Sequence, residues 1–154
     1  MKKWLCLLCA LWMMAMGAGA LAEAESGPER APHVDLDVRN DNFATDLHEI
    51  MHEADQTQPL TVRLSGYVYR YPAGEDQDVQ FAVLRDYFTE ENGVMPYGLD
   101  CYYEGDLPEN DAWVRVVGKT AFYEDADGES YLMLMVEQLD VAPEDQRGSK
   151  LVFN

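Results

Sequence analysis

The chain has little positive charge for its size. It carries 29 aspartates and glutamates against 11 lysines and arginines, which gives a formal net charge of −18. Such a surface repels phosphate backbones, so we expect no nucleic-acid partner. The excess negative charge favours solubility and attracts cations, and solvated acidic faces account for it without a specific ligand.

Long apolar segments are also scarce, and the one present lies at the N-terminus. A basic pair at 2–3 precedes an apolar run over 4–16, and an A-x-A cleavage site follows at 20–22. This order predicts a cleavable signal peptide over 1–22, because the run is shorter than the roughly 20 residues of a membrane helix. We therefore expect an extracytoplasmic protein, secreted or associated with the cell envelope, that is not transmembrane after cleavage. An uncleaved N-terminal anchor is the alternative.

After this segment the sequence has a single cysteine, Cys101. A single cysteine forms no internal disulfide, and in an oxidising compartment it is either buried or paired with another chain. We expect Cys101 to be buried, because it lies on the same face of the predicted strand as Leu99 and Tyr103. The sequence contains no G-x-S-x-G motif, no phosphate-binding glycine loop and no histidine near Cys101. These absences argue against a serine hydrolase of that type, a nucleotide-binding loop and a thiol enzyme.

The remaining chain has the organisation of one domain with short flanks. The polar stretch 23–41 is expected to be a flexible acidic arm, and 142–154 a C-terminal tail. Between them, 42–141 is expected to hold a helix and a β-barrel. Apolar residues at helical spacing predict a helix over 42–55, with Asn42 as its N-cap. That apolar stripe consists of Phe43, Leu47, Ile50, Met51 and Ala54.

Five segments after the helix have the composition and alternation of β-strands. They are 61–70, 78–88, 96–103, 112–123 and 130–141, separated by turns rich in glycine, proline and asparagine. Gly66 lies inside the first segment, where a glycine indicates a bent sheet. We predict a mainly β fold, a five-stranded closed barrel of the oligonucleotide/oligosaccharide-binding (OB) type preceded by one α-helix. A small β-sandwich is the alternative.

One motif suggests an enzyme. His48, Glu49 and His52 form an H-E-x-x-H sequence, in which two imidazoles one helical turn apart bind zinc and the glutamate acts as general base. This pattern predicts, as the alternative function, a small zinc-dependent hydrolase. Against it, both histidines fall on the side of the helix opposite the apolar stripe, and no histidine follows His52 to supply a third ligand. We therefore expect two solvated histidines and no catalytic residue.

Two acidic turns resemble parts of calcium loops. Residues 124–129 alternate carboxylates before Gly128, and 75–78 form a similar cluster. The first segment has Tyr123 where a calcium loop begins with an acidic residue. Asp-Gly between two strands is also the usual sequence of a hairpin turn, which we favour. No cofactor is expected, with zinc at 48–52 and calcium at 124–129 as the alternatives.

Three tyrosines of the first strand are the candidate binding surface. Tyr67, Tyr69 and Tyr71 alternate with the apolar residues of 61–70, so they face outward if those residues face the core. Exposed aromatic rings can stack on sugars or bind a partner protein. The alternative is that the helix over 42–55 covers them.

Residues 43–141 resemble the soluble C-terminal domain of a bacterial two-component permease subunit, a family of unknown function whose longer members carry N-terminal membrane helices. The matching stretches are the lead-in helix, LSGYVYR at 64–70, PYGL at 96–99 and WVRVVG at 113–118. The resemblance implies an exported accessory domain, here in a stand-alone form, with a membrane or envelope protein as partner. Family members carry adjacent cysteines after the second strand. Tyr87 and Phe88 stand there in this chain, so no metal or redox role is carried over.

Together these observations predict a secreted, non-enzymatic binding or accessory module with an unidentified ligand.

Overall fold

The computed structural model describes residues 33–55, 57–72 and 79–153. The predicted signal peptide at 1–22 and the first part of the predicted arm, 23–32, lie outside these residues. Within the described ranges, no helix is both long enough and apolar enough to cross a membrane.

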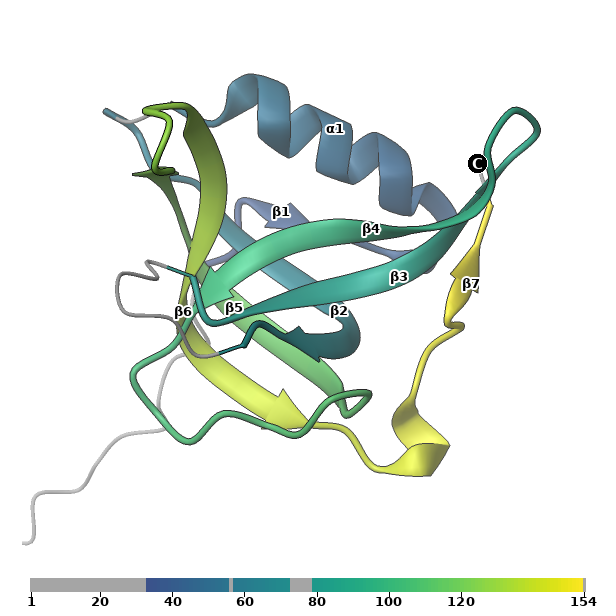
Figure 1. Ribbon diagram of the computed structural model, residues 1–154. Helices are drawn as coiled ribbons and strands as arrows, with labels where there is room; N and C mark the ends of the chain where they lie inside the picture. The colour runs from purple at the N-terminus through teal and green to yellow at the C-terminus, as the bar shows by residue number, and fades with distance from the viewer. Residues whose placement is uncertain (1–32, 56, 73–78, 154) are drawn as a thin grey trace, which may run out of the picture. The chain divides into compact units, whose positions relative to one another are not determined.

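Five strands close into a barrel, in the order β2–β5–β6–β4–β3 and back to β2 (Figure 1). They are β2 (Thr61–Arg70), β3 (Phe81–Thr89), β4 (Gly93–Tyr102), β5 (Trp113–Glu124) and β6 (Ser130–Val141). Neighbouring strands are antiparallel, except for β4 and β6, which pair in parallel. This closed arrangement confirms the predicted mainly β, OB-like barrel, and the sandwich alternative is wrong.

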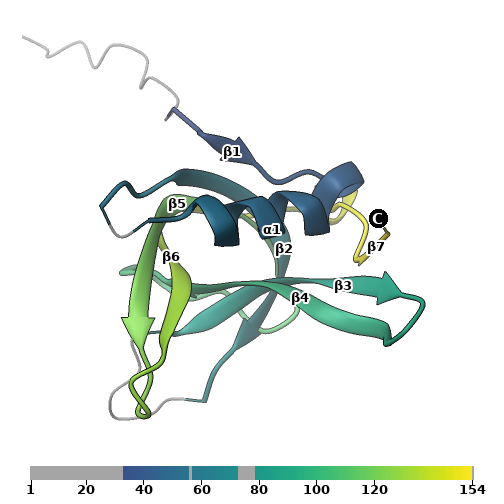
Figure 2. The same cartoon turned by 90° about the horizontal axis from the view of Figure 1, so that it is seen from above.

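The β3–β4 hairpin is longer than the sequence indicated. The predicted strand over 96–103 begins at Gly93 instead, and Pro96 pairs with Asp86 inside the ladder. Gly93 has a φ of 70°, which a glycine adopts readily, so the two strands run up to a tight turn. The hairpin extends beyond the barrel on the side where β7 (Leu151–Val152) lies (Figures 1 and 2).

Strand β2 bends so that it closes the barrel. Residues 61–67 pair with β5, and residues 67–70 pair with β3. A Cβ at Gly66 would overlap the carbonyl oxygen of Leu84, so only glycine allows this close approach of the two strands. The predicted role of Gly66 in a bent sheet is confirmed.

Helix α1 (Phe43–Glu53) lies across the barrel and packs into its core (Figure 2). Phe43, Leu47 and Ile50 are buried, whereas Met51, which the predicted stripe included, is exposed. The helix begins and ends within the predicted range 42–55. Its N-cap position is Asn42, but the side chain makes no capping hydrogen bond. Asn42 is the last residue of the 3-10 turn η1 (Asn40–Asn42), which runs directly into α1.

Arg85 is an arginine buried in the core. Arg85 is 2% exposed, and its Nε donates to the carbonyl oxygen of Ser65 at 2.7 Å. Its guanidinium carbon lies 5.1 Å from the ring centre of Phe43 and 5.0 Å from that of Trp113. The side chain therefore joins α1, β2, β3 and β5 through aromatic faces that suit a weakly hydrated cation. Burial lowers the pKa of this guanidinium to about 10.

Both flanks contribute strands to the sheet. Within the predicted flexible arm, Leu36–Asp37 form β1, which pairs in parallel with β2, so the arm prediction is wrong for this part. Leu36 packs against the core, and this apolar contact helps to hold β1 in place. In the predicted tail, the 3-10 turn η2 (Glu144–Gln146) precedes β7, which pairs with β3 and buries Val152.

Candidate functional site

A single carboxylate on the outer wall of the barrel accepts two tyrosine hydroxyls. Asp100 lies on β4 between Leu99 and Cys101, which both face the core, so its own side chain points outward. The hydroxyl of Tyr71 donates to Asp100 Oδ1 at 2.6 Å, and that of Tyr123 donates to Oδ2 at 2.9 Å. The carboxylate thus connects the end of β2 with the end of β5.

The wall on both sides of Asp100 is covered. Its register partners are Ala82 on β3 and Met133 on β6. Both alternate with core residues, and so face outward, yet they are only 2% and 8% exposed. Side chains therefore lie over the wall at this point instead of projecting straight into solvent.

Each of the two hydroxyl donors packs against a second, more exposed tyrosine. The rings of Tyr69 and Tyr71 are 5.5 Å apart in an edge-to-face arrangement, and those of Tyr123 and Tyr131 are 5.6 Å apart and stacked. Tyr69 is 50% exposed and Tyr131 is 45% exposed. We call these four tyrosines together with Asp100 the tyrosine–Asp100 surface.

The hydroxyls of Tyr71 and Tyr123 are held in the protonated state. Burial, the hydrogen bond to Asp100 and its negative charge raise the pKa of Tyr123 to about 12. The same causes, in the same order, raise the pKa of Tyr71 well above its usual value. Both hydroxyls are therefore stable donors to the carboxylate at neutral pH.

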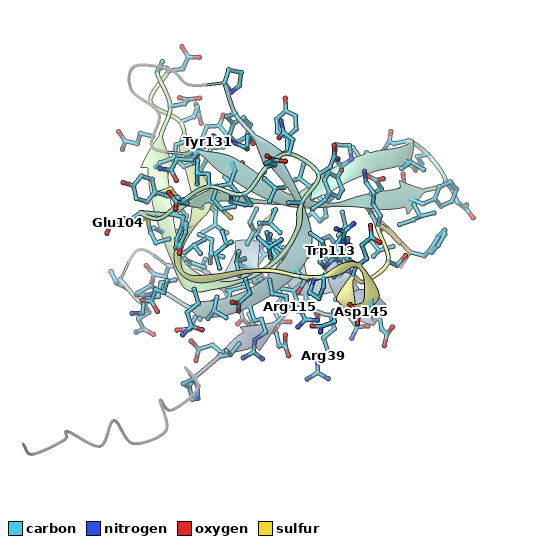
Figure 3. The ribbon with its side chains drawn as sticks, turned by 90° about the horizontal axis from the view of Figure 1, so that it is seen from below. Arg39, Glu104, Trp113, Arg115, Tyr131 and Asp145 are labelled. Carbon is cyan, nitrogen blue, oxygen red and sulfur yellow. The ribbon has the colours of Figure 1, made fainter. Side chains whose placement is uncertain are left out.

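The position of the surface in the barrel is relevant to binding. Tyr71 begins the connection from β2 to β3, and Tyr123 and Tyr131 flank the turn between β5 and β6. In OB barrels, ligands bind between the equivalent two connections. Figure 3 shows Tyr131 at the edge of the barrel, well separated from the labelled arginines, Arg39 and Arg115.

The structure does not place the three predicted tyrosines in one cluster. Tyr69 and Tyr71 belong to the tyrosine–Asp100 surface, but Tyr67 does not. Its hydroxyl donates to Asp86 Oδ1 at 2.7 Å, and Lys150 Nζ lies 4.0 Å from its ring centre, so the C-terminal segment contacts this ring. The alternative, that α1 covers the tyrosines, is wrong because α1 packs its apolar face into the core.

Three members of the surface were not predicted. Asp100, Tyr123 and Tyr131 lie on strands that are distant in sequence from Tyr69 and Tyr71. The available signal was the outward alternation of Tyr123 and Tyr131 on either side of the Asp127-Gly128 turn. Their meeting with Asp100 depends on the parallel pairing of β4 with β6, which the sequence pattern does not specify.

The H-E-x-x-H residues lie on the exposed side of α1. His48, Glu49 and His52 are all exposed, and the two imidazole rings are 4.3 Å apart in an edge arrangement. Among residues 33–55, 57–72 and 79–153, no group of three potential ligands is close enough to hold a metal ion. The solvated placement expected from the sequence is confirmed, and these residues offer a metal two ligands and no shelter from water.

The acidic turn at 124–129 is built as a hairpin. Asp125 Oδ1 accepts hydrogen bonds from the backbone N–H groups of Asp127 and Glu129, both at 2.9 Å. Gly128 has a φ of 81°, as a turn of this type requires. Asp125 therefore stabilises the turn, in agreement with the favoured interpretation. The similar cluster at 75–78 lies outside the described residues.

Cys101 is buried in the core, as predicted. Its Sγ donates to the carbonyl oxygen of Leu99 at 3.5 Å. Burial raises the pKa of this thiol far above its usual value, so little thiolate forms at neutral pH.

A polar pocket lies beside β1 and is lined mostly by charged residues. Asp37 forms ion pairs there with Arg63 at 3.5 Å and Arg39 at 3.6 Å. These opposite charges compensate each other, and the tyrosine–Asp100 surface remains the stronger candidate.

No protein-family model matches this chain, and no curated protein matches it either. The candidate site therefore rests on geometry and chemistry alone.

Proposed function

We propose that the chain is a non-enzymatic binding module and that its ligand occupies the tyrosine–Asp100 surface. The observation that carries this proposal is the double hydrogen bond to Asp100, with 2.6 Å and 2.9 Å to Tyr71 and Tyr123. It fixes Tyr71 and Tyr123 on one carboxylate, and Tyr69 and Tyr131 pack against these two rings, so little conformational freedom is lost when a ligand binds.

Binding without catalysis follows from the chemistry of this patch. Both carboxylate oxygens of Asp100 already accept a hydroxyl, and the raised pKa values of Tyr71 and Tyr123 keep those hydroxyls protonated. A protonated phenol is a weak nucleophile, and the five residues of this surface include no histidine, cysteine or lysine that could act as one. The hydrolase alternative receives no support from the exposed positions of His48 and His52.

The proposed setting is outside the cytoplasm. The N-terminal segment has a basic pair, an apolar run and a cleavage site in the order of a secretory signal. The net charge of −18 favours solubility in water. The resemblance over 43–141 to a permease-subunit domain supports an accessory role beside a membrane or envelope protein. In that arrangement the barrel presents its ligand to the partner.

Calorimetric titration of the purified protein with defined probes tests the proposal. The probes are hexasaccharides of glucose, of mannose and of N-acetylglucosamine, together with hexalysine as a cationic peptide. The test variant is Tyr69→Ser combined with Tyr131→Ser, and the control is Phe153→Ser, which removes an exposed ring that packs against Phe88 outside this surface.

The expected result is saturable binding of at least one probe that weakens by more than about tenfold in the double tyrosine variant, but not in the control. Circular dichroism checks that both variants stay folded. Equal binding by all three proteins, or no binding of any probe, contradicts the proposed site. Cleavage of a bound saccharide contradicts the non-enzymatic assignment.

A further inference from the structure

The two exposed rings of the tyrosine–Asp100 surface lie on opposite sides of the carboxylate. Tyr69 on β2, Ala82 on β3, Asp100 on β4 and Met133 on β6 are consecutive register partners across the outer wall. Tyr131 lies on β6, two residues from Met133. With strands about 4.8 Å apart, the path along the outer wall from Tyr69 over Asp100 to β6 covers three strand spacings, roughly 14 Å. A ligand that follows this path and touches both exposed rings must therefore be elongated.

Between these rings the carboxylate retains capacity for hydrogen bonds. A carboxylate oxygen can accept two hydrogen bonds, and the tyrosine hydroxyls use one on each oxygen of Asp100. Asp100 forms no ion pair with any described residue, so no cation among those residues competes for this capacity. The centre of the surface thus accepts hydrogen bonds from a ligand that carries donors.

The charge and shape of the surface restrict the class of ligand. A phosphate-bearing chain is repelled by Asp100 and by the net charge of −18. A small organic cation is best held by rings that enclose it. Here Tyr69 packs on Tyr71 and Tyr123 on Tyr131, so the rings form two separate platforms. Sugar rings have apolar C–H faces that lie flat on an aromatic ring and hydroxyl donors at their edges.

We infer that the ligand is an uncharged linear oligosaccharide that spans the barrel wall. One sugar ring stacks on Tyr69, another stacks on Tyr131, and a hydroxyl of the sugar between them donates to Asp100. This inference rests on the proposed function, because it assigns a ligand class to the same surface.

Titrations with saccharides of increasing length test the inference. Disaccharide, tetrasaccharide and hexasaccharide forms of the same three sugars are compared with hexalysine. Affinity is expected to rise with length until both rings are covered. Tyr69→Ser and Tyr131→Ser each lower the affinity for the longest saccharide roughly tenfold, the loss of one stacked ring. Both variants leave the affinity for the disaccharide less affected, since it touches one ring at a time.

Other outcomes separate this inference from the proposed function. If hexalysine binds, no saccharide does, and the tyrosine variants abolish that binding, the oligosaccharide is wrong and the binding surface stands. If the disaccharide binds as tightly as the hexasaccharide, the spanning arrangement is wrong. If the tyrosine variants change the binding of no probe, both proposals fail. Tyr69→Phe and Tyr131→Phe keep the rings and are expected to bind normally, which guards against misfolding of the serine variants.

Discussion

The hydroxyl of Tyr71 lies 2.6 Å from Asp100 Oδ1, although 29 residues separate the two along the chain. This hydrogen bond joins the end of β2 to β4 across the intervening strand β3. Tyr123 completes the bridge from the other side at 2.9 Å. Asp100 is therefore both a structural tie between strands and the polar centre of the proposed binding surface.

Asp100→Asn is expected to lower stability as well as binding. An amide nitrogen cannot accept a hydroxyl, so one of the two tyrosines loses its partner, and the other loses a charged one. The expected loss is about 1–2 kcal/mol in the free energy of unfolding, measured by urea denaturation. Asp106→Asn, at an exposed position that makes no hydrogen bond or ion pair with the described residues, is the matched control and is expected to change stability by less than about 0.5 kcal/mol. Equal stability of the two variants would show that the double hydrogen bond contributes nothing.

Stability is expected to fall at alkaline pH. Tyr71 and Tyr123 hold their protons more tightly in the folded state than in the unfolded chain, where the pKa is about 10. The two tyrosines contribute fully to the stability of the fold below about pH 10. This contribution is lost as the pH rises through their folded-state pKa values. The free energy of unfolding therefore decreases between about pH 10 and pH 12.

Tyrosinate formation, followed by ultraviolet absorbance or by NMR of the Tyr123 ring, reports this titration directly. In Asp100→Asn, the pKa of Tyr123 moves down from about 12 but stays above 10, since the charge and its hydrogen bond are gone while burial, the largest cause, remains. An unchanged midpoint in this variant would refute the hydrogen bond as a cause of the shift.

Gly66→Ala is expected to destabilise the barrel by about 1–3 kcal/mol, because the added Cβ overlaps the backbone of Leu84 and a backbone carbonyl cannot turn aside. The neighbouring Ser65→Ala, which adds no atom, is the control. Thermal unfolding of the two variants measures the difference. A Gly66→Ala protein as stable as its control would mean that the strands need not approach so closely.

Arg85→Lys is expected to lower the free energy of unfolding by about 2 kcal/mol. Lysine carries a compact, strongly hydrated charge and cannot present a planar, weakly hydrated cation to the rings of Phe43 and Trp113. The exposed Arg115→Lys is the control, with a change of less than about 0.5 kcal/mol in the free energy of unfolding. If both substitutions are equally mild, the stacked guanidinium is not required by the core.

Purified protein is expected to retain no stoichiometric zinc after dialysis. The exposed His48 and His52 provide two ligands in open solvent, which is too few for a structural or catalytic site. Elemental analysis of the wild type and of the variant with both histidines changed to alanine measures this. One zinc per chain in the wild type, lost in the variant, would restore the hydrolase alternative.

Much of the fold follows from local sequence patterns. The helix and the limits of β2 and β6 could be predicted because periodicity depends only on neighbouring residues. The bend at Gly66 could also be predicted, since a glycine within a strand usually marks close backbone approach. The short strands β1 and β7 could not be predicted, because a two-residue strand is too short to show an alternating pattern. Each forms only because it pairs with a longer strand.

The candidate site was less accessible from the sequence. Tyr69 and Tyr71 could be identified from alternation along one strand. Asp100 resembles any other outward carboxylate in a chain with 29 acidic residues. Its role depends on tyrosines from β2 and β5, and thus on the order of strands in the closed barrel. Tyr67, which alternation placed with the others, contacts a C-terminal segment whose position no local pattern specifies.

The most direct test of the binding surface is an amide NMR titration of the protein with the hexasaccharide that binds tightest. We predict that the largest chemical-shift changes occur at Tyr69, Asp100 and Tyr131, and that the signals of Phe88 and Phe153 stay in place. Changes confined to α1 or to the tip of the β3–β4 hairpin, or no changes at saturating saccharide, would contradict the assignment of the tyrosine–Asp100 surface as the ligand site.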